Sequence, residues 1–569
     1  MNELVRDFRT AARRLAKSPG FSAAVVLTLA LGIGANGAVF SVVRGVLLTP
    51  LPFDEPERLV RVHHGHRERG LEPGIFSPPD FQDLRAEDGV FEDLATYWFT
   101  PGHSGMNLTG GGEPLRVSAT FVSERFFPLL GVPAARGRAL AADENVPGRD
   151  AVAVLSDAFW HRRFGADPGI VGETILLDEQ PFTVVGVMPP GFTYPSATSD
   201  LWAPISLIGE DDIPTHRFLR WMDVVGRLAP DVSPEAAEAR VETLFAALAD
   251  EYPESNEGWT EASVVPLHEA LVGDVRPALL ILFGAVGAVL LIACANLANL
   301  FLVRAFGRER EMAIRTALGA ARGRLVRQHL AESVLLAVAG GLLGLLLTAW
   351  GARALLAVET GWAAASAAHG AAVGLEPVVV GFCVLLSVAT GVAFGLLPAL
   401  RGSRFQLAAA LSEGGAGGGE RRRNRAGALL VVAETAMAVV LLVAALFLAQ
   451  SFWRLVQEDP GFRSEGVLTL SITTDSDLFE AEGQRYAYRR QVLERLAALP
   501  GVLAVGGSKT VPLRGGGEPF SFQAPGRVEG GGEVRPESGG HIVTPGYFEA
   551  LGIEVLHGRD FSWDDPPER

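Results

Sequence analysis

The stretch that decides the fold is RAFGREREMAIRTALGAARGRLVRQHL, residues 304–330, which contains seven arginines between two long apolar runs. No charged residue occurs in 277–303 upstream or in 333–352 downstream. Each run is long enough to cross a hydrocarbon core, which takes about 20 apolar residues in a helix. The positive-inside bias places an arginine-rich connection in the cytoplasm. We therefore predict two membrane spans, 276–303 and 333–352, joined by the cytosolic loop 304–332.

Within this loop, the sequence predicts a short amphipathic helix that bends before the next span. Ile314 and Leu318 recur at helical spacing, with arginines elsewhere around the helix. Glu311 lies four residues before Arg315, the favourable order for an exposed ion pair. Gly319 suits the left-handed position that ends a helix. The prediction is a bent helical elbow in the cytosol.

The overall composition is that of a membrane protein with large soluble parts. Mean hydropathy is +0.25 and 20% of the residues are charged. The net charge is −16, although arginines gather around the apolar runs, so the acidic residues lie in the other segments. This disfavours nucleic acid as a partner, because phosphate binding needs a basic face. The two cysteines, Cys294 and Cys383, both fall in apolar runs and offer no disulfide framework.

The N-terminus predicts a cytosolic amphipathic segment, 1–20, followed by a first span, 21–48. Five basic residues precede an uncharged run over 21–43. A cleaved signal peptide is the alternative, with small residues at 35–38 for cleavage. We favour a retained span, because the run exceeds the 7 to 15 apolar residues of a signal peptide.

This first span contains GIGANG at 32–37, which matches the dinucleotide-binding pattern G-x-G-x-x-G, and Asp54 follows at a suitable distance. That site requires a preceding strand and a βαβ unit, whereas prolines follow here. Glycines on a helix surface let neighbouring spans approach closely. We therefore interpret the glycines as packing positions.

Residues 49–275 predict an α+β domain. A helix is expected from Ser233, as N-cap with Pro234 in the first turn, to about Tyr252. Because the first span starts in the cytoplasm, the domain lies outside. The predicted strands, rich in β-branched residues and bounded by Gly, Pro and Asp, are 59–62, 151–155, 174–177, 182–187 and 222–227.

Two further spans, 377–400 and 426–453, complete a five-span topology. The spans 333–352 and 377–400 are joined by a loop without Lys or Arg between Glu359 and Glu376. A Gly- and Arg-rich segment, 401–425, predicts a flexible cytosolic linker, and 426–453 then returns outward.

The remaining segment, 454–569, repeats part of the first outer domain. FVSERFFPLLGV at 121–132 is echoed by IVTPGYFEALGI at 542–553, and Gly137-Arg138 by Gly558-Arg559, both at a spacing of 421 positions. We predict an internal duplication and a second outer domain that is truncated at the end of the chain. The predicted fold class is an α-helical membrane protein with α+β extracytoplasmic domains, internally duplicated as span, outer domain, three spans, span, outer domain.

Few sequence motifs support an enzymatic function for this chain. His63, His64 and His66 lack further ligands for a metal nearby, which favours a solvated strand end. The sequence GSKT at 507–510 lacks the order of a Walker phosphate loop, since Gly507 stands where the lysine is required. Neither H-E-x-x-H nor a G-x-S-x-G elbow occurs. We predict no catalytic residue, no metal site and no cofactor in this chain.

Glu434 is the one acidic residue in the fifth span, and an ionisable residue there is a functional candidate. It lies about 12 Å along the helix from Ala426, at 1.5 Å per residue. Two interpretations stay open: it reaches the cytosolic interface, or it faces another helix.

The combination of these segments resembles the MacB and FtsX-like permeases of ABC systems, specifically the duplicated type. The resemblance rests on SPGF at 18–21, ALGIGAN at 30–36, LPFDEPERLV at 51–60 and REREMAIRTALGA at 308–320. The last segment is the most specific, since it resembles the family's cytosolic signature R-x-x-E-[IM]-x-I-R-x-A-L-G-A.

The resemblance implies a MacB-like periplasmic core domain, an FtsX-like membrane domain and a bacterial inner-membrane location. It implies a separate cytosolic ABC ATPase that holds MgATP and pushes on the elbow, with membrane lipid and a second permease copy or envelope proteins as further partners. The alternative is a non-transporting signalling or scaffold protein that regulates an envelope enzyme. The implied coupling residues are Arg308, Glu311, Ile314, Arg315, Leu318, Gly319 and Ala320.

Overall fold

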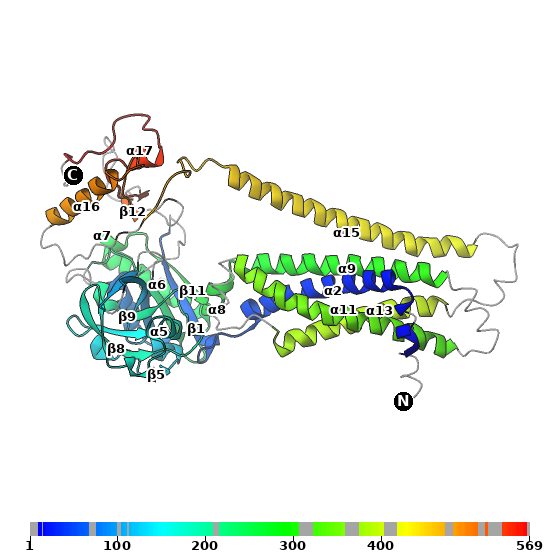
Figure 1. The fold of residues 1–569 in the computed structure, drawn as a ribbon. Coiled ribbons are helices and arrows are strands. Elements are labelled where there is room, and N and C mark those ends of the chain that lie inside the picture. Colours follow the sequence, from blue (N-terminus) through cyan, green and yellow to red (C-terminus); the bar gives the residue numbers. More distant parts are fainter. Residues whose placement is uncertain are drawn as a thin grey trace. The chain divides into compact units, whose positions relative to one another are not determined.

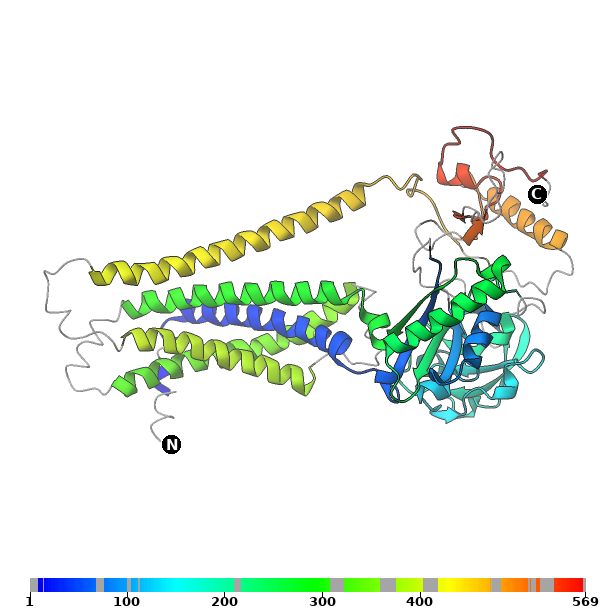
Figure 2. The ribbon, with the colours of Figure 1, turned by 180° about the vertical axis from the view of Figure 1, so that it is seen from behind.

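The computed structural model of the 569-residue chain forms two compact units, residues 1–443 and 444–569, which are considered separately. Figures 1 and 2 show the ribbon from opposite sides. The residues that the structure describes are 9–13, 15–67, 76–99, 104–110, 113–208, 216–306, 322–358, 375–402, 418–470, 472, 482–509, 512, 518–521 and 537–565.

The outer domain of the first unit contains a mixed sheet in which the described residues supply eleven strands. The order is β11-β1-β10-β2-β4-β3-β7-β8-β6-β9, β5 pairs with β8, and β4 also pairs with β9, which closes the last six strands of this order into a ring. The strands are β1 Leu59–Gly65, β2 Phe91–Trp98, β3 Gly105–Thr109, β4 Leu115–Val122, β5 Arg136–Gly137, β6 Val152–Leu155, β7 Thr174–Leu177, β8 Gln180–Val187, β9 Leu201–Pro204, β10 Asp223–Leu228 and β11 Glu261–Pro266.

All five predicted strands are present, as β1, β6, β7, β8 and β10, with ends that differ by a few residues. The predicted helix at Ser233 is also confirmed: the Ser233 side chain accepts a hydrogen bond from the Ala236 amide, and α6 ends at Glu251. The α+β prediction for this segment is therefore confirmed. The helices of the domain are α3 Pro78–Ala86, α4 Phe126–Leu130, α5 Asp157–Phe164, α6 Pro234–Glu251, α7 Pro253–Asn256 and α8 Leu267–Val272.

Two apolar cores cover the two faces of the sheet. Alternate residues of β1 point to opposite sides, so that Val60 belongs to one core and Leu59 to the other. The first core includes Phe245 of α6, together with side chains of α3 and α5. The second core includes Phe126 of α4 and Leu267 of α8. Helices therefore cover both faces of the sheet (Figure 1).

Five long helices coincide with the five predicted spans. Among the described residues, length and composition alone make four segments suited to cross a membrane, namely Pro19–Leu48, Arg276–Phe301, Ala331–Leu355 and Val431–Gln457, while Pro377–Val392 is a shorter apolar helix. The helices are α2 Pro19–Val43, which continues into the π-turn η1 Arg44–Leu48, α9 Arg276–Phe306, α11 Arg322–Val358, α13 Pro377–Gly402 and α15 Gly418–Gln457.

The helices extend beyond the apolar runs that predicted them. The connection 304–332 was predicted as a helical elbow that leads into the next span, and α11 begins within it at Arg322, whereas α15 begins at Gly418 inside the segment 401–425 that was predicted as a flexible linker. Hydropathy marks only the part of a helix that fits the hydrocarbon core. Arg, Leu, Gln and Glu are good helix formers, so a helix continues through them outside that core.

The second unit contains the end of α15 and a small set of elements. The strands β12 Glu518–Ser521 and β13 Glu537–Gly540 form an antiparallel pair. Two helices accompany this pair in the described residues, α16 Glu482–Ala497 and α17 Tyr547–Leu551.

The glycines of the first span pack against neighbouring helices, as predicted. The segment lies inside α2, and no strand precedes it in the described residues 9–13 and 15–18. A Cβ atom added at Gly32 would lie 2.7 Å from Leu290 of α9, and one at Gly34 would lie 2.7 Å from Leu347 of α11. At Gly37 it would lie 2.3 Å from Thr348 Oγ1. These distances leave no room for a side chain, so close helix approach accounts for the motif.

Hydrogen bonds tie the same crossing together. The Asn36 side-chain amide donates to the Gly32 carbonyl and, at 2.9 Å, to the Val286 carbonyl of α9. The Thr348 hydroxyl lies 3.3 Å from the Gly34 carbonyl and 2.9 Å from the Gly344 carbonyl. Polar groups buried in a helix bundle must find such partners, because lipid offers none. The helices α2, α9 and α11 are thereby held in one register.

We expect Gly37→Ala to destabilise the bundle by about 1–3 kcal/mol, the usual cost of overpacking, although alanine is otherwise the better helix former. The matched control is Gly284→Ala on α9, because nothing lies within 4 Å of a Cβ atom added there. Thermal unfolding of the detergent-solubilised chain measures the difference. Equal stability of the two variants would contradict the close packing.

Candidate functional site: the junction between the membrane helices and the outer domain

The seven predicted coupling residues lie outside the described residues. Residues 307–321 separate the end of α9 at Phe306 from the start of α11 at Arg322. The bent elbow therefore stays a prediction. It concerns Arg308, Glu311, Ile314, Arg315, Leu318, Gly319 and Ala320.

Glu434 lies on α15 and is half-buried, while its neighbours Ala433 and Thr435 are exposed. The Thr435 hydroxyl donates to the carbonyl of Val431 in its own helix. Both interpretations of Glu434, contact with the cytosolic interface and contact with another helix, stay predictions.

The burial of the histidines on and beside β1 differs from the prediction. We expected a solvated strand end, but His64 and His66 are only 0% and 3% exposed. His64 stacks on Phe245 with ring centroids 3.8 Å apart, and its Nε2 lies 3.1 Å from the Trp259 carbonyl oxygen. The side chains are buried because α6 and the segment around Trp259 cover this end of β1. No cluster of three metal-ligating side chains occurs among the described residues.

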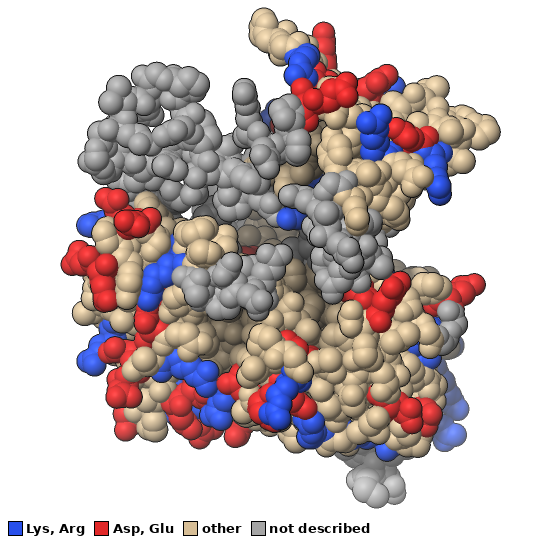
Figure 3. All heavy atoms as spheres, turned by 90° about the vertical axis from the view of Figure 1, so that its left-hand side faces the viewer, with Lys and Arg blue, Asp and Glu red and all other residues tan. Residues whose placement is uncertain are grey.

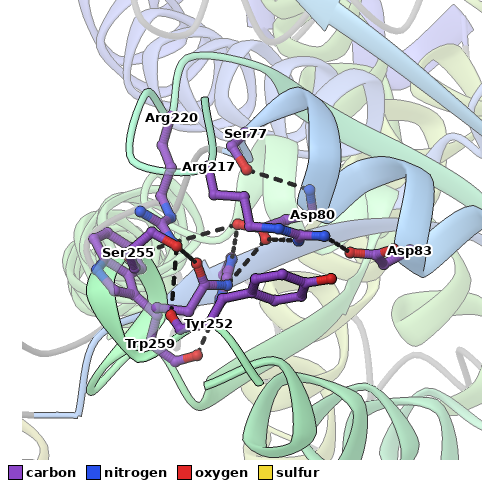
Figure 4. A network of polar contacts seen from close by, with 10 residues as sticks. Ser77, Asp80, Asp83, Arg217, Arg220, Tyr252, Ser255 and Trp259 are labelled. Atoms are coloured by element: carbon purple, nitrogen blue, oxygen red, sulfur yellow. Dashed lines mark hydrogen bonds and ion pairs between the residues drawn. The ribbon is translucent and has the colours of Figure 1, made fainter. Parts of the chain in front are cut away.

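A buried network of charges is centred on Asp80, beside His64, and Figure 4 shows Asp80 with Arg217 and Arg220. Asp80, at the start of α3, is 0% exposed. Its carboxylate accepts hydrogen bonds from Arg217 at 2.8 Å, from Arg220 at 3.3 Å and from the Asn256 side chain at 2.9 Å. His64 Nδ1 lies 3.8 Å from the same carboxylate. One carboxylate therefore ties α3, α7 and the segment before β10 together.

Aromatic rings complete the surroundings of both arginines. The guanidinium of Arg217 lies 3.9 Å from the centroid of the Tyr252 ring, and that of Arg220 lies 4.0 Å from Trp259. The ring faces are negative and attract these cations. The sequence alone did not reveal this network, because Asp80 is separated from the arginines by more than 130 positions. The spacing of Arg217 and Arg220 within HRFLRW was the only local signal.

The described surface of the outer domain shows no single sign of charge. Figure 3 shows basic and acidic side chains interspersed over the face that it presents. Several of them pair, such as Arg125 with Asp93 at 2.8 Å and Arg162 with Asp200 at 2.6 Å.

The junction between the membrane helices and the outer domain is formed by η1 and α8. The end of α2 runs through η1 towards β1, and β11 runs through α8 into α9. The strands β1 and β11 are antiparallel neighbours, with Val60 opposite Pro266. The two helices on either side of the domain are therefore connected, through residues 49–58 and through α8, to adjacent strands of one sheet.

An apolar cluster fills this junction. Val42, Val43 and Val46 from the end of α2 pack with Val272 of α8 and Leu279 of α9. The neighbouring residues of α8 connect the cluster to the domain, since Leu267 is in the second core and Leu271 packs against both clusters. A displacement of α2 relative to α9 therefore acts on packed side chains and on the β1–β11 pairing.

Comparison with known proteins gives two family matches. Residues 22–244 match the MacB-like periplasmic core domain, and residues 283–407 match the FtsX-like permease C-terminal domain. The first match covers the outer domain with the span before it, and the second covers the following membrane helices. Together they describe an inner-membrane protein with an extracytoplasmic α+β domain.

The chain belongs to the MacB/FtsX-like family of ABC permeases. Among its relatives, the pyoverdine export ATP-binding/permease protein PvdT of Pseudomonas syringae pv. tomato is 30% identical over 51% of this chain and 42% of that protein. The macrolide export ATP-binding/permease protein MacB of Azoarcus sp. is 28% identical over 72% of this chain and 60% of that protein. The chain thus spans about half the length of the curated relatives it matches.

A solved structure is also similar to the outer domain. It is the crystal structure of the periplasmic region of MacB from Actinobacillus actinomycetemcomitans, 17% identical over 41% of this chain and 95% of that chain, with a TM-score of 0.30.

We expect Asp80→Asn to destabilise the outer domain by about 3–5 kcal/mol, because it leaves the buried guanidinium of Arg220 without its carboxylate partner and removes one of the two carboxylates that pair with Arg217. The control is Asp83→Asn: Asp83 pairs with Arg217 at 2.6 Å but its side chain is 34% exposed, so its loss should cost about 1 kcal/mol or less. Urea unfolding followed by tryptophan fluorescence measures both. Equal losses would contradict the role assigned to Asp80.

A pH dependence follows from His64. Burial and the charge of Arg220 lower the pKa of His64 to about 4, against an ordinary value of 6.5. The unfolded chain therefore binds a proton below pH 6.5 that the folded chain does not bind. The contribution of neutral His64 to the free energy of unfolding is fully present above pH 6.5. It falls as the pH drops towards 4, by at most about 1.4 kcal/mol per pH unit.

The test compares wild type with His64→Phe, which keeps a ring against Phe245 but cannot titrate. We expect the variant to lose less stability between pH 6.5 and pH 4, measured by unfolding at each pH. Parallel curves for the two proteins would refute the assignment.

Proposed function

We propose that the chain is the membrane permease subunit of an ABC-type export or mechanotransmission system. A separate cytosolic ATPase, which holds MgATP, acts on the loop 304–332, and the membrane helices carry the displacement to the outer domain. The observation that supports this most is the junction, where α2 and α9 are connected, through residues 49–58 and through α8, to the neighbouring strands β1 and β11.

The helix α9 is suited to such a role. Its 31 residues span about 46 Å at 1.5 Å per residue. Its Phe306 end adjoins the predicted coupling loop, and its Arg276 end follows α8. A conformational change of this kind requires that the ATPase contacts the loop differently in its two states. The loop signature at 308–320 would provide those contacts.

The family matches support an ABC ATPase as the partner of the membrane helices. Both matches concern permease parts, and the names of the relatives combine ATP-binding and permease functions. The basic residues in 1–20, 304–330 and 401–425 support an orientation with these segments in the cytosol and the outer domain outside.

Equivalent local structures in the two units support the proposed duplication. Gly131 after α4 and Gly552 after α17 both adopt left-handed conformations, with φ of 69° and 65°. Arg138 forms two hydrogen bonds to Glu144, and Arg559 forms two to Asp565. These three pairs of positions keep the spacing of 421 that the sequence showed.

Backbone hydrogen bonds extend the correspondence. The Ser123 amide donates to the Thr96 carbonyl and the Thr96 amide to the Ser123 hydroxyl, each at about 3 Å. In the second unit, Thr544 and Gly507 exchange the same two bonds, at 2.9 and 2.7 Å. Such reciprocal bonds favour a second core-type domain over an unrelated segment.

The coupling proposal is tested with Glu311→Ala/Arg315→Ala and with Gly319→Pro. Affinity capture from membranes first identifies the ATPase, which is then reconstituted with the permease in liposomes. We expect normal insertion and at least a tenfold loss of permease-stimulated ATP hydrolysis, because the contact surface of the elbow is lost.

The matched control is Arg324→Ala, which removes a charge from the same connection outside the signature and should retain stimulation. Unchanged stimulation in the signature variants would contradict the coupling site. Capture of an envelope enzyme on the outer domain, without an ATPase, would favour the signalling alternative.

A further inference from the structure

One ion pair joins the outer ends of two membrane helices that lie far apart in the sequence. Arg44 Nε donates to Glu376 Oε2 at 2.8 Å across 332 positions. Arg44 is the first residue of the π-turn η1, which ends α2. Glu376 directly precedes α13, and its carbonyl accepts the Val380 amide of the first turn. The pair therefore links one helix end to one helix start.

The end of α2 has different contacts on its other side. Val43 and Val46 are packed in the apolar cluster with Val272 and Leu279. This cluster holds η1 to α8 and α9, while the ion pair holds it to α13. The π-turn is thus held by the apolar cluster on one side and by the ion pair on the other.

The local backbone of η1 is suited to a change of conformation. A π-turn has the i→i+5 hydrogen bonds that regular helices avoid, and such turns are frequent at functional sites. Here the Thr49 amide and the Thr49 hydroxyl both donate to the Arg44 carbonyl at 2.9 Å. Both hydrogen bonds close the turn on the same carbonyl, and the chain then continues towards β1.

Deeper in the bundle, the contact between α2 and α13 is apolar and close. Phe40 stacks on Phe382 with centroids 4.1 Å apart, and a Cβ atom added at Gly37 would lie 2.7 Å from Cys383 Sγ. The ion pair at the outer end is weaker, because its side chains are 30% and 38% exposed. A partly exposed pair changes an equilibrium by a factor of about five or less. The outer end can therefore separate while the deeper contact persists.

We propose that the Arg44–Glu376 ion pair is a releasable latch that holds the π-turn at the end of α2 against the start of α13. When the latch opens, the end of α2 stays with α8 and α9 and moves away from α13. Because η1 leads to β1, this motion is passed to the β1–β11 edge of the outer domain. The role of the latch in passing motion to the outer domain rests on the proposed function. The existence of the latch does not depend on that function.

The experiment measures the distance between the two helix ends in the full chain in lipid nanodiscs. Spin labels are placed at Leu48 and Leu375, which are 63% and 45% exposed and flank the pair, after Cys294 and Cys383 are replaced by alanine. Pulsed electron-electron double resonance then gives the distance distribution. We expect one main distance with the pair intact, and an added longer population with Arg44→Gln and with Glu376→Gln.

The charge swap Arg44→Glu/Glu376→Arg should reduce the longer population again, because it restores an ion pair in reverse. A matched control is Arg353→Gln on α11, which removes an exposed charge from the outer half of a neighbouring helix and should leave the distribution unchanged. Distributions that do not respond to either single variant, or a swap that does not restore the main distance, would overturn the latch.

This measurement needs no ATPase, so it separates the latch from the proposed function. Once the ATPase has been captured, ATP should increase the longer population in the wild-type chain. A response to Arg44→Gln without a response to ATP would support the latch and count against ATPase coupling.

Discussion

The hydrogen bonding of β1 to β11 is the constraint on which the rest of the first unit depends. One strand follows α2 and the other precedes α9, so their pairing brings the outer ends of two membrane helices together. The valines at the end of α2, Val46 of η1 and the residues of α8 then fill the space between them. The outer domain is therefore held at two adjacent points of one sheet edge, an arrangement that can pass a relative motion of two helices to a sheet.

Inside the bundle, close approach replaces the hydrophobic effect as the source of helix association. Lipid is as apolar as the helix surfaces, so helices associate through van der Waals contact and hydrogen bonds. Gly32, Gly34 and Gly37 supply the contact for α2, while Asn36 and Thr348 supply the bonds. A closely packed bundle resists internal shear, and the partly exposed pair of Arg44 with Glu376 is the weaker contact at its outer end.

The sequence-based predictions succeeded where a feature depends on residues that are close together in the sequence, and failed where it depends on distant ones. The five helices, the five strands and the capped helix at Ser233 depend on local periodicity and capping, and all were predicted. The glycines of 32–37 could be assigned to packing because the surrounding sequence lacked the βαβ context. The histidines were misjudged, since their burial depends on Phe245 and Trp259, which are about 180 and 195 positions away. The start of α15 at Gly418 was missed, because hydropathy marks the part of a helix inside the hydrocarbon core and not its full length.

By itself, the sequence determined that this chain crosses a membrane several times, which segments carry the positive charge, that an α+β domain stands between the first two spans, and which family it resembles. These properties follow from hydrophobic runs, charge and short motifs, which act over a few turns of chain. Only the tertiary structure decided that β4 pairs with β9, that one carboxylate joins Arg217 to Arg220, and that Arg44 meets Glu376. The physical reason is that these contacts join residues 80 to more than 300 positions apart, and local sequence patterns do not specify which distant partners meet.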